Sequence, residues 1–190
     1  MANGNKKLIL ASGSPRRREL LAKMGYVFEI CAPDVDEHVS GHASDIVYTL
    51  AQRKAKAAAA HYADGVIIAS DTLVSLDGAP LGKPADAADA RAMLKALSDR
   101  EHEVFTGVCV LDAATGQSET RAVRTGVTFR DLTDAEIDAY IATGEPMDKA
   151  GAYAIQGGAG AFVTGCDGSY TNVIGLPTER LEAILSDMLG

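Results

Sequence analysis

The residues of this sequence best suited to chemistry begin with a cluster of cations in an unusual place. Three arginines at positions 16–18 follow Pro15 directly, which puts them in the first turn of a predicted helix. The macrodipole and the unpaired N–H groups of such a turn favour anions. Two interpretations stay open: a solvated basic turn balanced by Glu19, or a site where a phosphate engages N–H groups and guanidinium groups together.

A lysine interrupts an apolar helical stripe further along the chain. The apolar positions of that stripe are Val47, Leu50, Ala51 and Ala58. Lys54 falls on the same helical face, where an apolar residue is expected. Its ammonium group either reaches the surface along its aliphatic stem or points into a polar pocket beside the core. Lys83, within Leu-Gly-Lys-Pro, reads on its own as a loop lysine.

Two groups of carboxylates are candidates for a catalytic or metal-binding role. Asp71 follows the apolar run at 66–69 and is predicted near the carboxyl end of a buried strand, where open α/β sheets bind ligands. A partly desolvated carboxylate there can act as a general base or a metal ligand. Asp36 and Glu37, preceded by Asp34, could hold a hard cation through carboxylate oxygens. Taken alone, each group is also typical of a turn or a solvated loop.

The bulk properties exclude several classes of partner. The formal net charge of −8 repels nucleic acid and anionic membranes, so an anionic ligand needs a local basic pocket. Aromatic residues make up 5% of the chain and Trp is absent, which argues against stacking platforms for single-stranded nucleic acid. No apolar run reaches the roughly 18 residues that span a bilayer, and the polar segment 1–7 predicts no signal peptide.

The three cysteines and the missing motifs narrow the functional class further. An odd number of widely spaced cysteines argues against a disulfide framework and predicts a reducing, cytoplasmic location. The sequence contains no Walker A loop, no strand-linked G-x-G-x-x-G and no G-x-S-x-G motif. P-loop NTPases, dinucleotide oxidoreductases and α/β-hydrolases therefore lose support.

The elements that must position these residues alternate first and then become β-rich. Predicted strands lie at 8–11, 66–69, 73–76, 103–111 and 120–129, and predicted helices at 15–24, 44–61, 85–97, 133 onward and 177–189. The glycine-rich segment 151–175 is expected to form short strands and loops. This order predicts one domain over residues 1–190, with an α/β or α+β fold and a mixed twisted sheet flanked by helices.

Five segments taken together resemble the Maf family of nucleotide pyrophosphatases. They are LASGSPRRRELL at 10–21, SDTLV at 70–74, LGKP at 81–84, DKAGAYAIQGGAGAFV at 148–163 and GSYTNVIGLP at 168–177. They occur in family order and span nearly the whole chain. The resemblance implies two lobes around a deep cleft, as in Maf and ITPase folds, and cleavage between the α- and β-phosphates of a nucleoside triphosphate with a divalent cation, Mg²⁺ or Mn²⁺.

The resemblance also implies roles for individual residues. Asp71 matches the general base and, with Glu37, a metal position. The positions that match substrate specificity are Arg16, Thr72 and Gln156. The positions expected to hold phosphate are Ser12, Arg17, Lys54, Lys83 and Lys149. Arg53 departs from the family pattern, in which a Glu often precedes the lysine.

The combination at the specificity positions resembles the branch that acts on dTTP and UTP. Two alternatives stay open: a pyrophosphatase for modified pyrimidine nucleotides, and a nucleotide-sensing regulator of septum formation that needs no turnover. A retained Asp71 favours an enzyme, because a sensor needs the cations and no base. A homodimer is possible, and neither nucleic acid nor membrane is expected as a partner.

Overall fold

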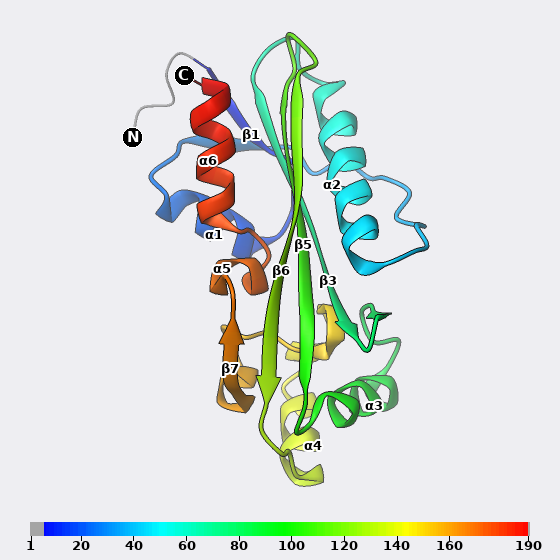
Figure 1. Cartoon of the computed structure of the whole chain (residues 1–190). Coiled ribbons are helices and arrows are strands. Elements are labelled where there is room, and N and C mark those ends of the chain that lie inside the picture. Colours follow the sequence, from blue (N-terminus) through cyan, green and yellow to red (C-terminus); the bar gives the residue numbers. More distant parts are fainter. Residues whose placement is uncertain (1–5, 190) are drawn as a thin grey trace.

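The computed structural model describes residues 6–189 and contains one open mixed sheet at its centre (Figure 1). The strand order is β2-β1-β3-β5-β6-β7, with β4 paired to β3. The strands are β1 Leu8–Leu10, β2 Phe28–Ile30, β3 Val66–Leu76, β4 Ala79–Leu81, β5 Glu101–Asp112, β6 Ser118–Phe129 and β7 Val163–Asp167. Pairing is parallel between β1 and its neighbours β2 and β3, and antiparallel in the rest of the sheet. The predicted mixed sheet with flanking helices is confirmed.

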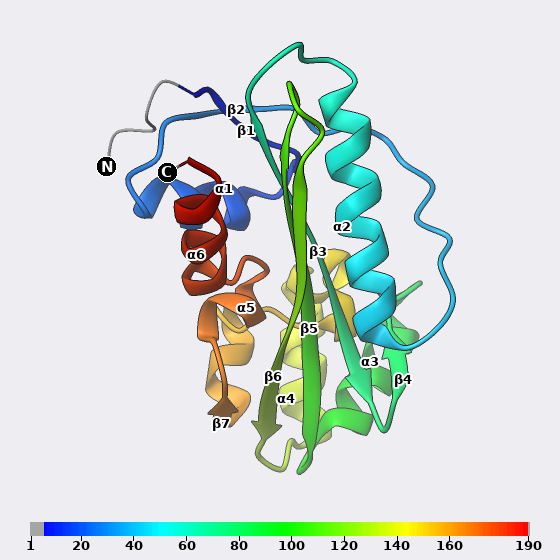
Figure 2. The ribbon, with the colours of Figure 1, turned by 45° about the horizontal axis from the view of Figure 1, so that its top comes forward.

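Helices cover both faces of this sheet. They are α1 Pro15–Lys23, α2 Ala43–Ala59, α3 Ala87–Leu97, α4 Asp134–Ala142, α5 Tyr170–Ile174 and α6 Thr178–Leu189. At one end of the long strands, α2 lies on one side and α1 with α6 on the other, while α3 and α4 lie at the opposite end (Figures 1 and 2). The long strands β3, β5 and β6 run through both ends, so they connect the parts of the molecule that border the cleft described below.

The alternation of side chains along the strands divides the core between the two faces. Ile67 and Ala69 pack with the alanines of α2, whereas Val66 and Ile68 pack with the leucines of α1 and α6. This is the period of two expected for a strand covered on both faces. Gly107 allows the close approach of α2, since a Cβ atom there would lie 2.1 Å from the carbonyl oxygen of Val47.

Local sequence signals located most helices and the long antiparallel pair. Thr133 and Glu136 form the predicted capping box at the start of α4. Ser14 is the N-cap of α1 as predicted, although its side chain makes no capping hydrogen bond. The prediction of short strands and loops for 151–175 was only partly right. The segment contains the short strand β7, but it also contains 3₁₀ turns at Ala150–Ala152 and Gly158–Phe162 and the helix α5.

The prediction of separate strands at 66–69 and 73–76 was wrong. β3 is one strand of 11 residues, and β5 pairs with it continuously from Val66 to Ser75. The ladder with β5 satisfies the backbone groups that a turn would otherwise have to satisfy. Asp71 therefore lies within a strand. It still lies beyond the end of the parallel neighbour, because β1 pairs with β3 only as far as Leu10 and Ile68.

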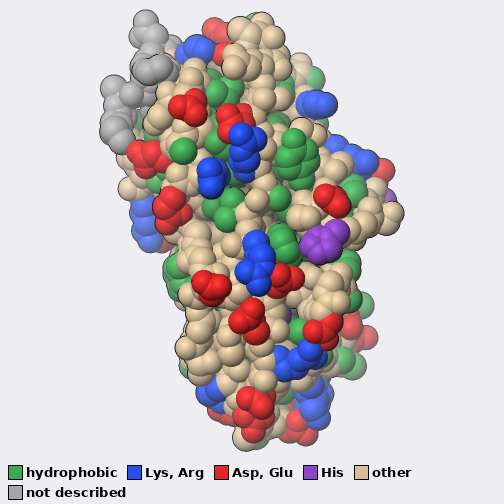
Figure 3. All heavy atoms as spheres, in the orientation of Figure 1, with side chains coloured by type: hydrophobic (Ala, Val, Ile, Leu, Met, Phe, Trp, Pro, Cys, Tyr) green, Lys and Arg blue, Asp and Glu red, His purple; other side chains and the backbone are tan. Residues whose placement is uncertain are grey.

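Charges of both signs are distributed over the surface (Figure 3). Acidic and basic side chains are interspersed over the face shown in Figure 3, and no broad basic area covers that face. Within residues 6–189, no helix is both long and apolar enough to cross a membrane. Residues 1–5 and 190 lie outside the described residues, and so does most of the segment for which no signal peptide is predicted.

A buried histidine links stability to pH. His102 is 2% exposed and its Nε2 lies 2.8 Å from the Tyr153 hydroxyl, while burial lowers the pKa of His102 from 6.5 to about 4. Unfolded chains bind a proton here as pH falls below 6.5 and folded chains do not, so stability declines between pH 6.5 and 4. We expect the titration of His102 to lower the free energy of unfolding by about 2 kcal/mol at pH 4.5.

Urea unfolding at pH 7 and pH 4.5 checks this expectation with two variants. His102→Gln should lose less stability than wild type over that interval, because the titrating group is gone. His61→Gln, which changes an exposed histidine, should retain the wild-type loss. Equal losses in all three proteins would show that other groups cause the decline.

Candidate active site

All the predicted site residues line a single cleft of about 760 Å³. They are Ser12, Arg16, Arg17, Glu37, Lys54, Asp71, Thr72, Lys83, Lys149 and Gln156. The charged groups of the lining are five cations and three carboxylates, which gives a formal charge of +2 in a chain of net charge −8. This is the local basic pocket that an anionic ligand requires, at a size usual for small-molecule sites.

Neighbouring elements bring these distant residues together. β1 and β3 are parallel neighbours. The chain after β1 passes through Ser12 into the first turn of α1, so these residues lie beside the part of β3 that continues past β1. α2 lies across the same strands and brings Lys54 to the level of Asp71. Lys83 follows β4, and the segment 148–156 forms the remaining wall.

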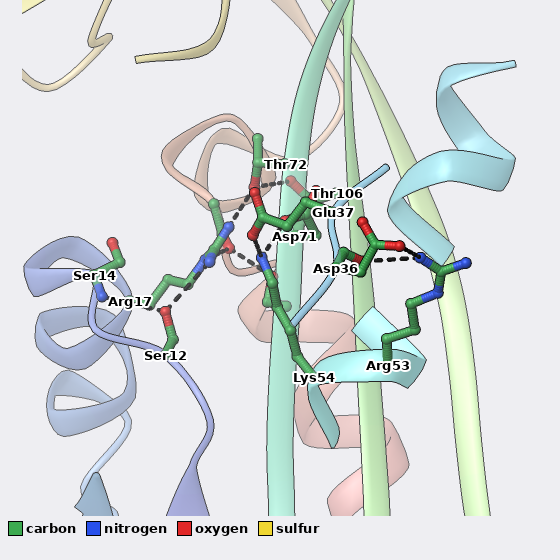
Figure 4. Close-up of polar contacts among 12 residues, drawn as sticks. Ser12, Ser14, Arg17, Asp36, Glu37, Arg53, Lys54, Asp71, Thr72 and Thr106 are labelled. Atoms are coloured by element: carbon green, nitrogen blue, oxygen red, sulfur yellow. Dashed lines mark hydrogen bonds and ion pairs between the residues drawn. The ribbon is translucent and has the colours of Figure 1, made fainter. Parts of the chain in front are cut away.

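Lys54 joins two carboxylates of the cleft lining (Figure 4). Its Nζ lies 2.6 Å from Oδ1 of Asp71 and 2.7 Å from Oε1 of Glu37. The Lys54 and Asp71 side chains are each 15% exposed, so the pair is largely removed from water. The hydrogen bond from Lys54 lowers the pKa of the Glu37 carboxyl, against the opposing effect of partial burial. Of the two interpretations of Lys54, the structure shows the second, in which the ammonium group points into a polar pocket.

The structure separates the acidic residues that precede α2. Glu37 turns inward to Lys54 and lines the cleft. Asp36 turns away, and its Oδ1 accepts hydrogen bonds from the backbone N–H and ring of His38. The interpretation of Asp36 and Glu37 as a joint cation site was wrong, because successive side chains of an extended segment point in opposite directions.

The carboxylates that do converge fit a divalent cation. Among residues 6–189, no group of three or more His, Cys, Asp or Glu side chains forms a metal cage. Asp71 and Glu37 nevertheless present oxygens to the same point, where the Lys54 ammonium lies. Magnesium typically takes one or two carboxylates and completes its shell with water and substrate phosphate, so this pair of ligands suits an ion that arrives with a nucleotide.

Arg17 has a structural role that its sequence context did not reveal. Its guanidinium donates from Nε to the Gly175 carbonyl at 2.8 Å, from Nη1 to Ser12 Oγ at 3.3 Å and from Nη2 to Thr72 Oγ1 at 3.0 Å. Burial lowers the pKa of Arg17 below its usual value. Arg17 therefore ties α1 to β3 and to the end of α5. Its phosphate role stays a prediction, and so does that of Ser12.

The other two arginines of the cluster differ in their surroundings. Arg16 lines the cleft, whereas Arg18 is exposed on the outside of α1. The interpretation as a basic turn balanced by Glu19 is not what the structure shows, because Glu19 pairs with Lys23 at 2.8 Å. One arginine faces the cleft, one is built into its wall and one faces solvent.

Gln156 lies on a turn held by residues to which the sequence assigned no role. Glu145 accepts a hydrogen bond from the Gly158 N–H at 3.0 Å, and the Tyr140 hydroxyl accepts one from Ala154 N–H at 3.0 Å. A Cβ atom at Gly157 would lie 2.0 Å from the Glu145 carboxylate. The paired glycines after Gln156 were the available signal: they allow Glu145 to approach the backbone and fix the turn.

Sequence reasoning missed two further residues, one beside the cleft lining and one within it. Gly175, at φ +123°, accepts hydrogen bonds from both Arg17 and Ser70 through its carbonyl oxygen. Asp148 lines the cleft and pairs with Lys149. Both lie in segments that carried the family resemblance, but nothing in their local spacing indicated what they would contact.

Comparison with known proteins identifies the family. A family model described as Maf-like protein matches residues 7–188. A dTTP/UTP pyrophosphatase of Moorella thermoacetica is 50% identical over 182 residues, covering 95% of this chain and 94% of that protein. Proteins of the same description from Pelotomaculum thermopropionicum and Bacillus cereus are each 48% identical, with coverage of 95% and 95% for the former and 93% and 87% for the latter. The chain belongs to the Maf-like family.

Proposed function

We propose that this protein hydrolyses dTTP and UTP to the monophosphate and pyrophosphate, with a divalent cation, in the cytoplasm. The observation that carries the proposal is the Lys54 ammonium joining Asp71 and Glu37 inside a cationic cleft. The names of the relatives, dTTP/UTP pyrophosphatase at 48–50% identity, support the same reaction. Neither nucleic acid nor a membrane is a partner in this proposal, and a homodimer remains an expectation.

Asp71 acts as the general base in the proposed mechanism. Lys54 holds Oδ1 of Asp71, so Oδ2 is the oxygen that takes a proton from the attacking water. The new bond forms between the water oxygen and the α-phosphorus, and the bond from that phosphorus to the α,β-bridging oxygen breaks. Pyrophosphate leaves with the electron pair. Positioning and charge neutralisation dominate such transfers.

The cations of the cleft hold the triphosphate in line for this attack. The ammonium groups come from Lys54, Lys83 and Lys149. Arg17 donates from those N–H groups of its guanidinium that make no hydrogen bond within the protein. A Mg²⁺ or Mn²⁺ ion held by Asp71 and Glu37 would neutralise charge on the triphosphate and on the leaving pyrophosphate. Ser12 orients Arg17 through the hydrogen bond between them.

We assign base selection to Gln156, Arg16 and Thr72, which all line the cleft. Gln156 offers an amide that both donates and accepts, as the edge of a pyrimidine base does. Arg16 lies at the start of α1 on the same cleft. The Thr72 hydroxyl accepts a hydrogen bond from Arg17 and lies 3.0 Å from the Thr106 hydroxyl. Thr72 therefore affects the pocket by fixing the position of the Arg17 guanidinium.

The test is product analysis over a panel of nucleoside triphosphates with Mg²⁺ or Mn²⁺. We expect UMP or dTMP together with pyrophosphate, and no turnover after the cation is removed with EDTA. Orthophosphate as the first product would contradict the proposal. Tight nucleotide binding without turnover would favour the regulator of septum formation, and faster turnover of modified pyrimidine nucleotides would favour the alternative enzyme.

We expect Gln156→Glu to change base preference more than it changes turnover of the best nucleotide. The substitution keeps the size of the side chain and replaces its two N–H donors with a negative charge at a position away from the reacting phosphorus. The ratio of kcat/KM between UTP and the other triphosphates should shift by about ten- to a hundredfold. Gln117→Glu, at the exposed turn between β5 and β6, is the matched control. A uniform loss for every nucleotide would place Gln156 among the phosphate contacts.

A further inference from the structure

We propose that Arg53 is a positioning residue that holds the segment 36–39 in the register that places Glu37 at Lys54 and Asp71, and so sets the affinity of the site for its divalent cation. Arg53 is not among the residues that line the cleft, and it departs from the family pattern at this position. The inference rests on the proposed function, because it assigns Glu37 to the metal.

The guanidinium of Arg53 holds the backbone on both sides of Glu37. Its Nη1 donates to the carbonyl oxygen of Asp36 at 2.8 Å and to that of His38 at 3.4 Å. The same atom lies 4.0 Å from Oδ2 of Asp36. Figure 4 shows this guanidinium beside Asp36, which lies between it and the Lys54 ammonium. Contacts to carbonyl oxygens fix the course of the chain and not merely one side chain.

The segment needs such a contact because no regular structure holds it. Residues 31–40, all within the described part of the chain, form neither helix nor strand. Glu37 and Val39 line the cleft, whereas Asp36 and His38 do not. A shift of one residue along this extended segment would exchange the two sets and turn the Glu37 carboxylate away from Asp71.

Two consecutive residues of α2 therefore act on Glu37 from opposite sides. Lys54 binds its carboxylate, and Arg53 binds the carbonyl groups that flank it. The carboxylate of Glu37 is the group that would bind a cation, and Lys54 contacts that same group. The hydrogen bonds of Arg53 go only to backbone carbonyl groups here, so they leave the Glu37 carboxylate free to bind a cation.

The sign of the expected effect separates positioning from simple electrostatics. Arg53 is a cation near a cation site, so removing its charge would by Coulomb's law tighten metal binding. Positioning predicts the opposite, a weaker site. Groups that orient a metal ligand typically change affinity by about 10- to 100-fold when they are removed. Arg53 acts through the backbone and is 42% exposed, which favours the lower end of this range.

The test is a titration of the full chain with Mn²⁺ in the presence of a non-hydrolysable UTP analogue. Electron paramagnetic resonance measures how much Mn²⁺ is bound. Arg53→Ala should weaken Mn²⁺ binding about tenfold, and Arg53→Lys should recover part of the loss because an ammonium can still donate to one carbonyl. Lys56→Ala removes an equal charge from an exposed position of the same helix and should not weaken binding. In assays of pyrophosphate release, Arg53→Ala should raise the half-saturating Mn²⁺ concentration and leave kcat at saturating Mn²⁺ near wild type.

A double-mutant cycle with Glu37→Gln identifies the path of the effect. If Arg53 acts through Glu37, Arg53→Ala should have little further effect on Mn²⁺ binding once Glu37 is changed. Equal losses in both backgrounds, tighter binding by Arg53→Ala, or a wild-type protein that takes up no Mn²⁺ would each overturn the proposal. Wild type that binds Mn²⁺ with this dependence on Arg53 but releases no pyrophosphate would leave the inference standing and refute the proposed function alone.

Discussion

Asp71→Asn is expected to lower pyrophosphate release from UTP by about two to four orders of magnitude, the usual effect of removing a general base. Asparagine nearly matches aspartate in size, so the largely buried position in β3 should remain well packed. Its amide oxygen can still accept the hydrogen bond from Lys54, but it cannot take a proton from water at neutral pH. Pyrophosphate-release kinetics at saturating Mg²⁺ measure the loss.

Binding should be affected much less than turnover. The substitution removes a negative charge beside the triphosphate and should tighten binding, whereas the loss of one metal ligand works against that gain. Calorimetry with a non-hydrolysable UTP analogue should therefore give an affinity equal to or tighter than wild type. Asp77→Asn, at the turn after the same strand, is the control and should turn over normally. Near-normal turnover by Asp71→Asn would remove Asp71 from the mechanism and leave Glu37 as the next candidate.

Lys54→Met is expected to lower kcat/KM for UTP by about two to three orders of magnitude, the range observed when one preorganised electrostatic group is removed from an active site. Methionine keeps the length of the stem that crosses the core face of α2 and removes only the charge. The triphosphate then loses a cation, and Asp71 loses the partner that fixes its orientation. Lys56→Met, on the exposed side of the same helix, should leave kcat/KM unchanged.

The same variant should depend more strongly on a divalent cation for its stability. Without the ammonium, Asp71 and Glu37 face each other with no charge between them, and like charges at this distance repel. A cation that occupies the vacated position should relieve this repulsion. We therefore expect Mn²⁺ to raise the Tm of Lys54→Met more than that of wild type at pH 8. Equal increases, together with unchanged kcat/KM, would show that Lys54 does not organise the two carboxylates.

Local signals in the sequence were sufficient for most elements of the fold. The capping pair Thr133 and Glu136, Pro15 at the start of α1 and the apolar period of α2 each act within a few residues, so they can be read from spacing alone. The five family segments went further and named a set of residues that all line one cleft. That step relied on resemblance, because nothing in local spacing relates Arg16 to Gln156.

Contacts between distant parts of the chain decided the rest. β3 continues through Asp71 because β5 supplies a partner for its backbone, and residues 70–72 alone look like a turn. Arg17 binds the Gly175 carbonyl across a separation of 158 positions, which no pattern near either residue encodes. Asp36 and Glu37 have nearly the same chemistry, yet only Glu37 faces the cleft.

The sequence by itself thus determined most of the helices, the antiparallel pair, the family and the residues that line the cleft. Only the tertiary structure decided which of those residues contact one another and which surround the cleft as supports. Propensity, capping and periodicity are interactions between residues close in the chain. The orientation of Glu37, by contrast, depends on Lys54 and Arg53, which approach it only after α2 has packed against β3 and β5.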